Sequence, residues 1–293
     1  MHALTLATPE RAHADHAFTL HRQDQPPGVR HDRTLRRGST GGLRLPWSTA
    51  ADKEGMVGAD DYDGFAADYD VENSASLLNA YYERPAVLSL AGDVRGRRIL
   101  DAGCGAGALA ASLLARGAQV TGFDGSPAMI KLAHRRLGDG VRLLVHDLAQ
   151  PLPFEDQAFD DVVASLVLHY LEDWSRPLAE IRRVLRPGGR IIASINHPFV
   201  RQHFVPDQDY FAIQQYREDC TFDGRPAVLT MWHRPLRQVV RAFVDAGFDL
   251  RNIDEPEPSP DTPHELLPPR IANGERSAFL SFLFIVGEKP APL

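Results

Sequence analysis

Three aspartates between residues 101 and 147 each end a segment rich in apolar residues, and a glycine-rich segment directly follows the first of them. These are Asp101, Asp124 and Asp147, and Gly103 and Gly105 follow the first. A carboxylate can hold a cation or accept hydrogen bonds from sugar hydroxyls, and a glycine turn lets a ligand touch bare main chain. These residue types predict a nucleoside-binding site, with positive charge on the part of the ligand that meets Asp101.

The elements that would position these groups alternate between strand and helix. A buried strand at Ile99-Leu100 runs into the glycine turn, and an alanine-rich helix over residues 106–116 ends at Gly117. Strand, glycine turn and helix open a nucleotide-binding α/β unit, and the helix N-terminus offers unpaired N–H groups to the ligand. Further strands predicted over residues 118–124, 141–147, 159–165 and 190–196 would form a parallel sheet whose carboxyl ends meet at one edge.

The glycine pattern alone leaves two ligands open. Gly103-x-Gly105-x-x-Ala108 satisfies the dinucleotide pattern of NAD-binding enzymes, and Asp124 lies 21 residues past Gly103, where a ribose-binding acid is expected. Asp101 favours S-adenosylmethionine (SAM) instead. A carboxylate at the lip of the turn would repel a pyrophosphate, whereas SAM carries an ammonium and a sulfonium and no phosphate.

Three motifs support that choice. Asp101-x-Gly-x-Gly-x-Gly107 resembles the first motif of the class I SAM-dependent methyltransferases. Asp147-Leu-x-x-x-Leu-Pro-Phe154, with Phe159-Asp160 after it, resembles the same group closely, and a generic dinucleotide fold does not require it. The segment Asp61-Tyr-Asp-Gly-Phe-Ala-Ala-Asp-Tyr-Asp70 resembles the one with which small-molecule methyltransferases cover SAM. The resemblance runs from about residue 62 to residue 196 and points to the ubiquinone/menaquinone-biosynthesis (methyltransferase type 11) branch.

The resemblance implies a Rossmann-like α/β fold: a seven-stranded, mostly parallel sheet with helices on both faces and a closing hairpin. An aromatic-rich insertion after the fifth strand, about residues 198–232, would cap the cleft over an apolar or ring-bearing substrate. SAM is the implied cofactor. Its predicted binding residues are Tyr69, Asp101, Gly103, Cys104, Gly105, Asp124, Gly125, Ser126, Met129, Asp147, Leu148 and Ser165.

Several of these residues have individual expected roles. Asp124 can accept both ribose hydroxyls, and the flexible thioether of Met129 would pack on the adenine. At the end of the third strand, Asp147 would take the adenine exocyclic amine while the N–H of Leu148 meets a ring nitrogen. Tyr69 is expected to cover the bound cofactor.

Two histidines are candidates for catalysis, because a neutral imidazole can take a proton near pH 7. His197 directly follows the fifth predicted strand, which would place it at the carboxyl edge of the sheet. His169 follows the fourth strand, where the resembling family often carries a structural histidine. The rivals for a general base are His203, Tyr210 and His233. No cluster of Cys and His has metal-ligand spacing, so no metal is expected.

Composition narrows the classes of partner. The chain has 293 residues and a net charge of −7, and neither nucleic acid nor an anionic membrane attracts a negative protein. No apolar run reaches the roughly 20 residues of a membrane span. Cys104 and Cys220 are the only cysteines, so a cytoplasmic location without a disulfide framework is expected. The sequence leaves the oligomeric state open.

The domain organisation is expected to be simple. Residues 1–57 hold five histidines, scattered arginines and little apolar periodicity, which predicts a disordered tail. Met56 is a candidate for the native start. A single methyltransferase domain is expected over residues 58–293.

We therefore predict an enzyme that transfers a methyl group from SAM to a small-molecule acceptor by in-line displacement. Three rivals stay open. A tRNA or rRNA methyltransferase would share the fold but need a basic patch. A NAD-dependent oxidoreductase would bind NADH and ignore SAM. A non-catalytic SAM-binding protein would hold the cofactor and methylate nothing.

Overall fold

A computed structural model describes residues 62–222 and 224–291. The tail expected over residues 1–57 and the start suspected at Met56 lie outside these residues. Within them, no helix combines the length and the apolarity that crossing a bilayer requires.

A seven-stranded sheet forms the centre of the molecule, in the order β3-β2-β1-β4-β5-β9-β8. Strands β1 to β5 are parallel to their neighbours within that set, and β9 is antiparallel to both β5 and β8. The predicted seven-stranded, mostly parallel sheet is confirmed. The strands are β1 (Arg98–Ala102), β2 (Gln119–Asp124), β3 (Arg142–Val145), β4 (Phe159–Ser165), β5 (Leu185–Asn196), β8 (Asp249–Asp254) and β9 (Phe282–Glu288).

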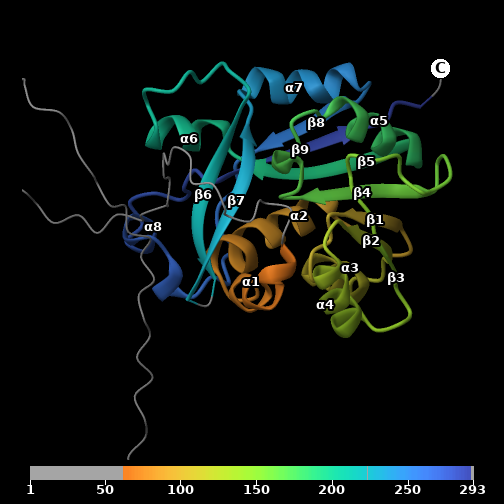
Figure 1. The fold of residues 1–293 in the computed structure, drawn as a ribbon, viewed down its shortest axis with the longest axis horizontal. Helices are drawn as coiled ribbons and strands as arrows, with labels where there is room; N and C mark the ends of the chain where they lie inside the picture. The colour runs from red at the N-terminus through yellow and green to blue at the C-terminus, as the bar shows by residue number, and fades with distance from the viewer. Residues whose placement is uncertain (1–61, 223, 292–293) are drawn as a thin grey trace, which may run out of the picture.

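Different helices cover the two faces of the sheet (Figure 1). Helices α2 and α3 pack on one face around Ile99 and Val163, with α4 beside α3. Helices α5 and α7 pack on the other face around Leu100 and Val162. Successive residues of a strand point to opposite faces, so these apolar pairs serve both cores. The helices are α2 (Arg84–Ala91), α3 (Ala108–Ala115), α4 (Pro127–Leu137), α5 (Ser175–Val184) and α7 (Leu236–Asp245).

The helical stretch before β1 differs from a simple reading of the sequence. Its periodicity predicts one helix over residues 74–83 and a second opened by Pro85. Instead, α1 (Ala66–Asn73) comes first, and a π-helical turn at Asn79–Glu83 runs directly into α2. π-Turns interrupt α-helices mostly at functional sites, and this one ends at Glu83, next to Arg84.

Regular structure fills the insertion after β5, where the sequence shows no clear periodicity. Strands β6 and β7 form an antiparallel hairpin that stands at the left-hand end of the sheet in Figure 1. Alternate residues of the hairpin, such as Leu229 and Met231, pack with Val200 in a small separate core. The elements are α6 (Pro198–Phe204), β6 (Gln214–Phe222) and β7 (Arg225–His233).

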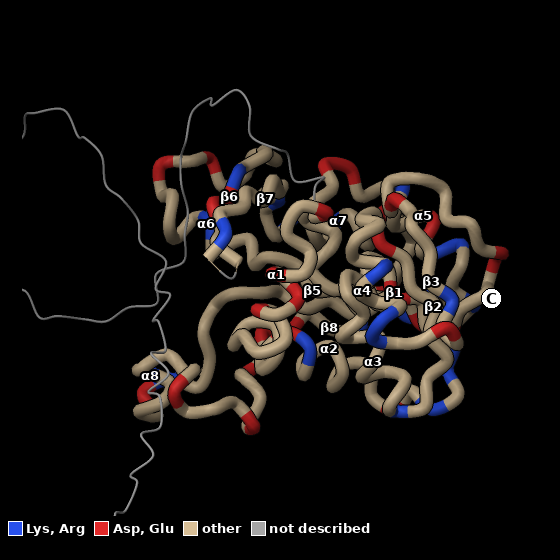
Figure 2. Tube along the Cα trace, turned by 60° about the horizontal axis from the view of Figure 1, so that its bottom comes forward, with Lys and Arg blue, Asp and Glu red and all other residues tan. Residues whose placement is uncertain are grey.

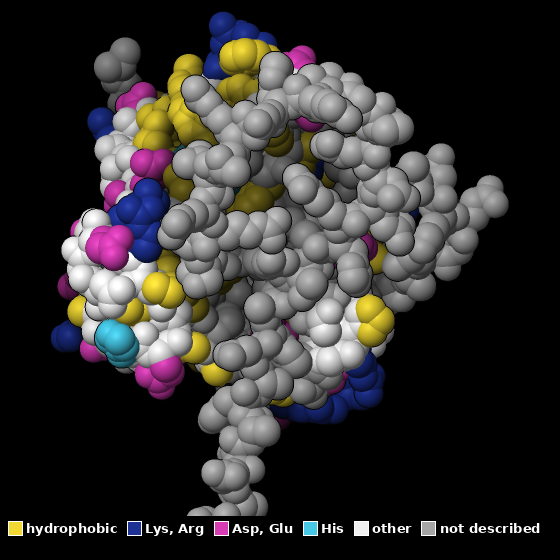
Figure 3. Space-filling view, turned by 90° about the vertical axis from the view of Figure 1, so that its left-hand side faces the viewer, with side chains coloured by type: hydrophobic (Ala, Val, Ile, Leu, Met, Phe, Trp, Pro, Cys, Tyr) yellow, Lys and Arg dark blue, Asp and Glu magenta, His cyan; other side chains and the backbone are white. Residues whose placement is uncertain are grey.

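The surface at this end of the molecule is partly apolar. Figure 3 shows hydrophobic side chains gathered at the top of the face, and Phe199 and Phe211 are exposed hydrophobic residues of the α6 region. The guanidinium of Arg237 lies 5.0 Å from the ring centroid of Phe211. Another irregular segment links β8 to β9 and contains the short helix α8 (Pro269–Ala272).

Candidate active site

A cavity of about 720 Å³ lies at the carboxyl ends of β1, β2, β3 and β4. Helices α1 and α2 and the β6–β7 hairpin contribute the remaining walls. Its volume is within the range of small-molecule and cofactor sites. All the residues predicted to bind the cofactor line it, as the crossover rule requires of groups that follow parallel strands. They are Tyr69, Asp101, Gly103, Cys104, Gly105, Asp124, Gly125, Ser126, Met129, Asp147, Leu148 and Ser165.

The glycine turn needs glycine for two different reasons. At Gly103, with φ +75°, a Cβ would come within 2.5 Å of a methyl group of Val167. At Gly105, with φ +51°, a Cβ would meet nothing within 4 Å, because that position faces the open cavity. The N–H groups of Gly103 and Cys104 both donate to the carbonyl of Phe123 at 2.9 Å, which fixes the turn against β2. The turn thus presents bare main chain to a ligand.

Asp124 is held in place by the main chain around it. One of its oxygens accepts the N–H of Gly105 at 2.8 Å, and the other accepts the N–H of Ser126 at 2.9 Å. The Ser126 side chain accepts the N–H of Met129 and so caps α4. Burial raises the pKa of Asp124 in spite of these donors. A carboxylate oxygen has a second lone pair, so both oxygens can still accept hydroxyl donors from the cavity.

Asp101 is the most unusual group of the site. Its side chain is 1% exposed, and neither oxygen has a hydrogen-bond partner among the described residues. Burial, followed by repulsion from Glu83 and Asp124, raises the pKa of Asp101 to about 7. The backbone of Ala110 opposes this rise only weakly, because it makes no hydrogen bond to the carboxylate. A buried carboxylate without donors costs free energy when ionised, and a cation in the cavity would remove that cost.

Glu83 and Arg84 are charged residues of the site that were not predicted from the sequence. Glu83 is buried, and one of its oxygens accepts the hydroxyls of Ser165 and Ser194, each at 2.6 Å. Burial raises the pKa of Glu83 and lowers that of Arg84, and both side chains line the cavity. Both come from a helix rather than from a strand end. Helical periodicity could have found Glu83, since it lies four residues before the buried Val87.

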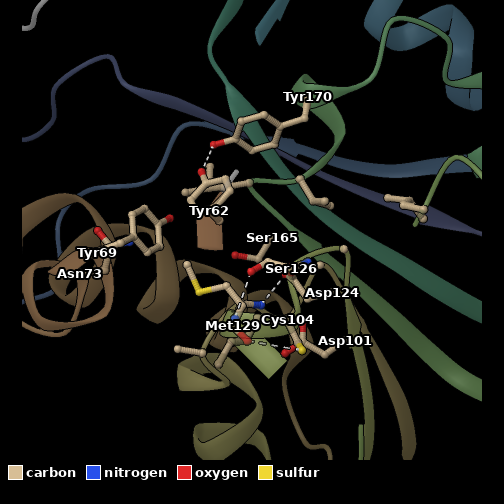
Figure 4. A pocket seen from close by; sticks show the side chains of 18 of the residues that line it. Tyr62, Tyr69, Asn73, Asp101, Cys104, Asp124, Ser126, Met129, Ser165 and Tyr170 are labelled. Carbon is tan, nitrogen blue, oxygen red and sulfur yellow. Dashed lines mark hydrogen bonds between the residues drawn. The ribbon is translucent and has the colours of Figure 1, made fainter. Parts of the chain in front are cut away.

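Aromatic side chains form another wall (Figure 4). The hydroxyls of Tyr62 and Tyr170 form a hydrogen bond, and Tyr69 meets Tyr62 edge-on with 5.2 Å between ring centroids. Burial raises the pKa of all three phenols, that of Tyr69 to about 12. The hydroxyls are therefore neutral at physiological pH. Met129, 2% exposed, packs in a small cluster below Tyr62 and Tyr69.

The remaining predicted cofactor residues differ in character. Burial raises the pKa of the Cys104 thiol, and the charges of Asp101 and Asp124 raise it further. Cys104 therefore stays a thiol and is no nucleophile. Asp147 is exposed, and its side chain accepts the N–H of Ala149 at 2.8 Å. Leu148 is buried beside it.

Both catalytic candidates lie outside the lining of this cavity. Nδ1 of His197 accepts the N–H of Phe199 at 3.2 Å and caps α6, and Nε2 lies 2.7 Å from a carboxylate oxygen of Glu255. Burial lowers the pKa of His197, and Glu255 opposes the shift. Nδ1 of His169 accepts the N–H of Asn196 at 3.3 Å, and burial lowers its pKa to about 3. In each case the imidazole accepts a main-chain N–H, which is a structural role, and neither ring lines the cavity.

The other proposed bases do not reach the cavity either, since His203, Tyr210 and His233 are absent from its described lining. The lining contains one imidazole, that of His146, which directly precedes Asp147. The described side chains therefore offer positioning groups rather than a base at the centre of the site.

The hairpin lies in the segment expected to cap the cleft, about residues 198–232, and supplies four cavity residues that were not assigned individually from the sequence: Gln215, Arg217, Thr230 and Trp232. The sequence does contain a signal for a β-hairpin here. Asp223-Gly224 is a strong hairpin dipeptide, and Ala227, Leu229 and Met231 alternate after it.

Comparison with known proteins agrees with this geometry. Residues 100–193 match the sequence model of a methyltransferase domain. The demethylmenaquinone methyltransferase of Clavibacter sepedonicus is 39% identical over 142 residues, which are 48% of this chain and 58% of that protein. The ubiquinone/menaquinone biosynthesis C-methyltransferase of Desulfotalea psychrophila is 36% identical over 156 residues, 49% of this chain and 63% of that protein. The matches thus span about six tenths of these relatives.

A solved structure shows the same fold. The SAM-dependent methyltransferase of Mesorhizobium loti aligns with a TM-score of 0.54 and 23% identity, over 70% of this chain and 96% of that one. The glycine turn and the three strand-end aspartates lie within the matched residues 100–193. Residues 100–193 of this chain therefore match a methyltransferase domain, and the chain has the fold of SAM-dependent methyltransferases.

Proposed function

We propose that the chain binds SAM in this cavity and transfers its methyl group to a small-molecule acceptor. The observation that carries the proposal is Asp101, a buried carboxylate that lines the cavity without a partner among the described residues. The ammonium and sulfonium of SAM suit a wall that holds Asp101 and Glu83. Arg84, on the same side, suits the carboxylate of the methionine part.

The rest of the cofactor would follow the sheet edge. Asp124 would accept the ribose hydroxyls with its free lone pairs, and Met129 would pack on the adenine. Asp147 and Leu148 would meet the polar edge of the base. Asp124 ends β2 and Asp147 follows β3, and these two strands are neighbours in the sheet.

Bound SAM supplies an electrophilic methyl group and a neutral thioether leaving group. The protein then has to hold the acceptor in line and exclude water. Tyr62, Tyr69 and Tyr170 would do the latter, since their rings form a continuous apolar wall. The catalytic roles expected for His169 and His197 gain no support from their placement, so we assign the reaction to positioning.

The class of the acceptor and the cellular location of the protein are also proposals. The names of the two relatives above refer to demethylmenaquinone and to ubiquinone/menaquinone biosynthesis. The tyrosines and Trp232 suit an aromatic or apolar acceptor of this kind. A nucleic acid is not favoured, because acidic and basic residues interleave along the described trace in Figure 2. A cytoplasmic location remains the expectation from the cysteine content.

Calorimetric titration with SAM tests the cofactor site. Asp124→Ala should weaken SAM binding roughly tenfold or more, because charge-assisted hydrogen bonds are lost. Asp249→Asn, on the exposed end of β8, should leave the affinity unchanged. Equal affinity in Asp124→Ala and wild type would count against this site. Methyl-labelled SAM and a panel of small acceptors then separate an enzyme from a non-catalytic binder.

A further inference from the structure

The hairpin turns one polar face toward the cavity, and the register of the two strands fixes which residues form it. Gln215 pairs with Trp232, and Arg217 pairs with Thr230. All four side chains line the cavity. The residues between them, Tyr216 and Met231 for example, are buried in the separate core on the other face. The hairpin cannot slip by one residue without exposing that core, so this face is fixed.

Arg217 is the cation of this face and differs from the arginines around it. Among residues 62–222 and 224–291, its guanidinium has no hydrogen bond and no ion pair with a carboxylate. Nearby arginines are all engaged. Arg225 pairs with Asp68 at 3.3 Å, Arg201 lies 4.2 Å over the ring of Tyr216, and Arg234 lies 4.6 Å over the ring of Trp174.

The cavity is divided by charge. Its sheet side carries the carboxylates of Asp101, Asp124 and Asp147, and Glu83, at the end of the π-helical turn before α2, lines the cavity with them. The four hairpin residues include no acid. An anionic group would be repelled from the sheet side and attracted to Arg217. Arg84 also lines the cavity, but it lies beside Glu83 and is the residue that we propose for the carboxylate of SAM. For an acceptor with an anionic group, this leaves one favourable orientation, with the anion at the hairpin and the other end toward the methionine part of SAM.

A ring would fit beside that anion. Trp232 is the diagonal cross-strand neighbour of Arg217, and diagonal pairs in antiparallel strands lie about 7–8 Å apart. One molecule can then stack on the indole while its acidic group meets the guanidinium. Guanidinium groups bind carboxylates and phosphates in a bidentate manner.

We propose that the methyl acceptor is an aromatic compound with a carboxylate or phosphate, and that Arg217 binds this anionic group. The inference rests on the proposed function, because it concerns the acceptor half of the same cavity. It names a specificity-determining residue and a substrate class.

Binding of matched probes tests it. The full chain, saturated with S-adenosylhomocysteine, is titrated with 4-hydroxybenzoate, 4-hydroxyphenyl phosphate and the neutral 4-hydroxybenzamide. Wild type should bind an acidic probe roughly tenfold more tightly than the amide. Arg217→Gln should remove that preference. Arg225→Gln, a matched change in the same hairpin outside the cavity lining, should retain it. The two acidic probes distinguish a carboxylate site from a phosphate site.

Three results would overturn the proposal: equal binding of acid and amide by wild type, an unchanged preference in Arg217→Gln, or no binding of either acidic probe. Titration of Arg217→Gln with SAM is the fold and cofactor control, and its affinity should match wild type. Failure of the proposed function looks different, since wild type would then fail to bind SAM or S-adenosylhomocysteine at all.

Discussion

Asp101 and Glu83 bring two buried carboxyl groups to one wall of the cavity, and repulsion from Glu83 contributes to the raised pKa of Asp101. The two groups are not equivalent. Glu83 accepts two serine hydroxyls, whereas Asp101 has no partner among the described residues. The sheet thus holds a proton-binding carboxyl at the point where we propose that a cationic cofactor binds.

The first prediction concerns the pH dependence of SAM binding. With a pKa of about 7, Asp101 is mostly protonated at low pH, and a cation prefers the ionised form. The affinity for SAM should rise roughly tenfold between about pH 5.5 and pH 7, a range in which the α-amino group of SAM stays protonated. Calorimetry in buffers of different ionisation enthalpy should detect proton release on binding. A flat profile would contradict the assignment.

Asp101→Asn should also change how stability depends on pH. The folded pKa of Asp101, about 7, lies above its ordinary value of 3.8, so the folded state binds more protons between these values. Its contribution to the free energy of unfolding therefore falls as pH rises through this window. In the absence of SAM, the Tm of Asp101→Asn relative to wild type should be higher at pH 8 than at pH 4. An identical difference at both values would refute this account.

Substitution by alanine should have different effects at the two glycines Gly103 and Gly105 of the turn. Gly103→Ala places a Cβ 2.5 Å from Val167 at φ +75°, so it should lower the free energy of unfolding by more than about 1 kcal/mol. Gly105→Ala meets open space and should reduce stability less, but its methyl group would intrude on a bound ligand. Chemical denaturation and SAM titration of both variants separate the effects. Equal loss of stability in the two would contradict the geometry.

Most of the sheet edge could be predicted from the sequence, because local rules place it. Strand–helix alternation forces a parallel sheet, and parallel strands bring their carboxyl ends together. Asp101 and Asp124 lie at the carboxyl ends of β1 and β2, and Asp147 follows β3. Their convergence therefore needed only the fold class. The cap of α4 at Ser126 is equally local.

The parts that the sequence did not reveal depend on tertiary contacts. Glu83 lies in a π-helical turn, and its side chain is held in the site by the hydroxyls of Ser165 on β4 and Ser194 on β5. Arg217 and Trp232 reach the cavity because the hairpin folds back over the sheet edge (Figure 1). For His197 the reverse holds: the sequence suggested a residue of the active site, and the structure places its side chain outside the cavity. Its position after β5 is right, but its ring turns to cap α6 and meet Glu255.

His197 gives the last prediction, which separates a structural imidazole from a catalytic one. His197→Ala removes the acceptor for the N–H of Phe199 and should lower the free energy of unfolding by about 1 kcal/mol. His197→Asn keeps an acceptor at the cap and should restore most of that loss. Because a general base contributes roughly 10²–10⁴-fold, a catalytic His197 would lose at least that much kcat in both variants. We expect kcat per folded molecule to stay near wild type in both, measured with an acceptor that the panel identifies. A large fall in kcat for His197→Asn, with wild-type stability, would return His197 to the list of bases.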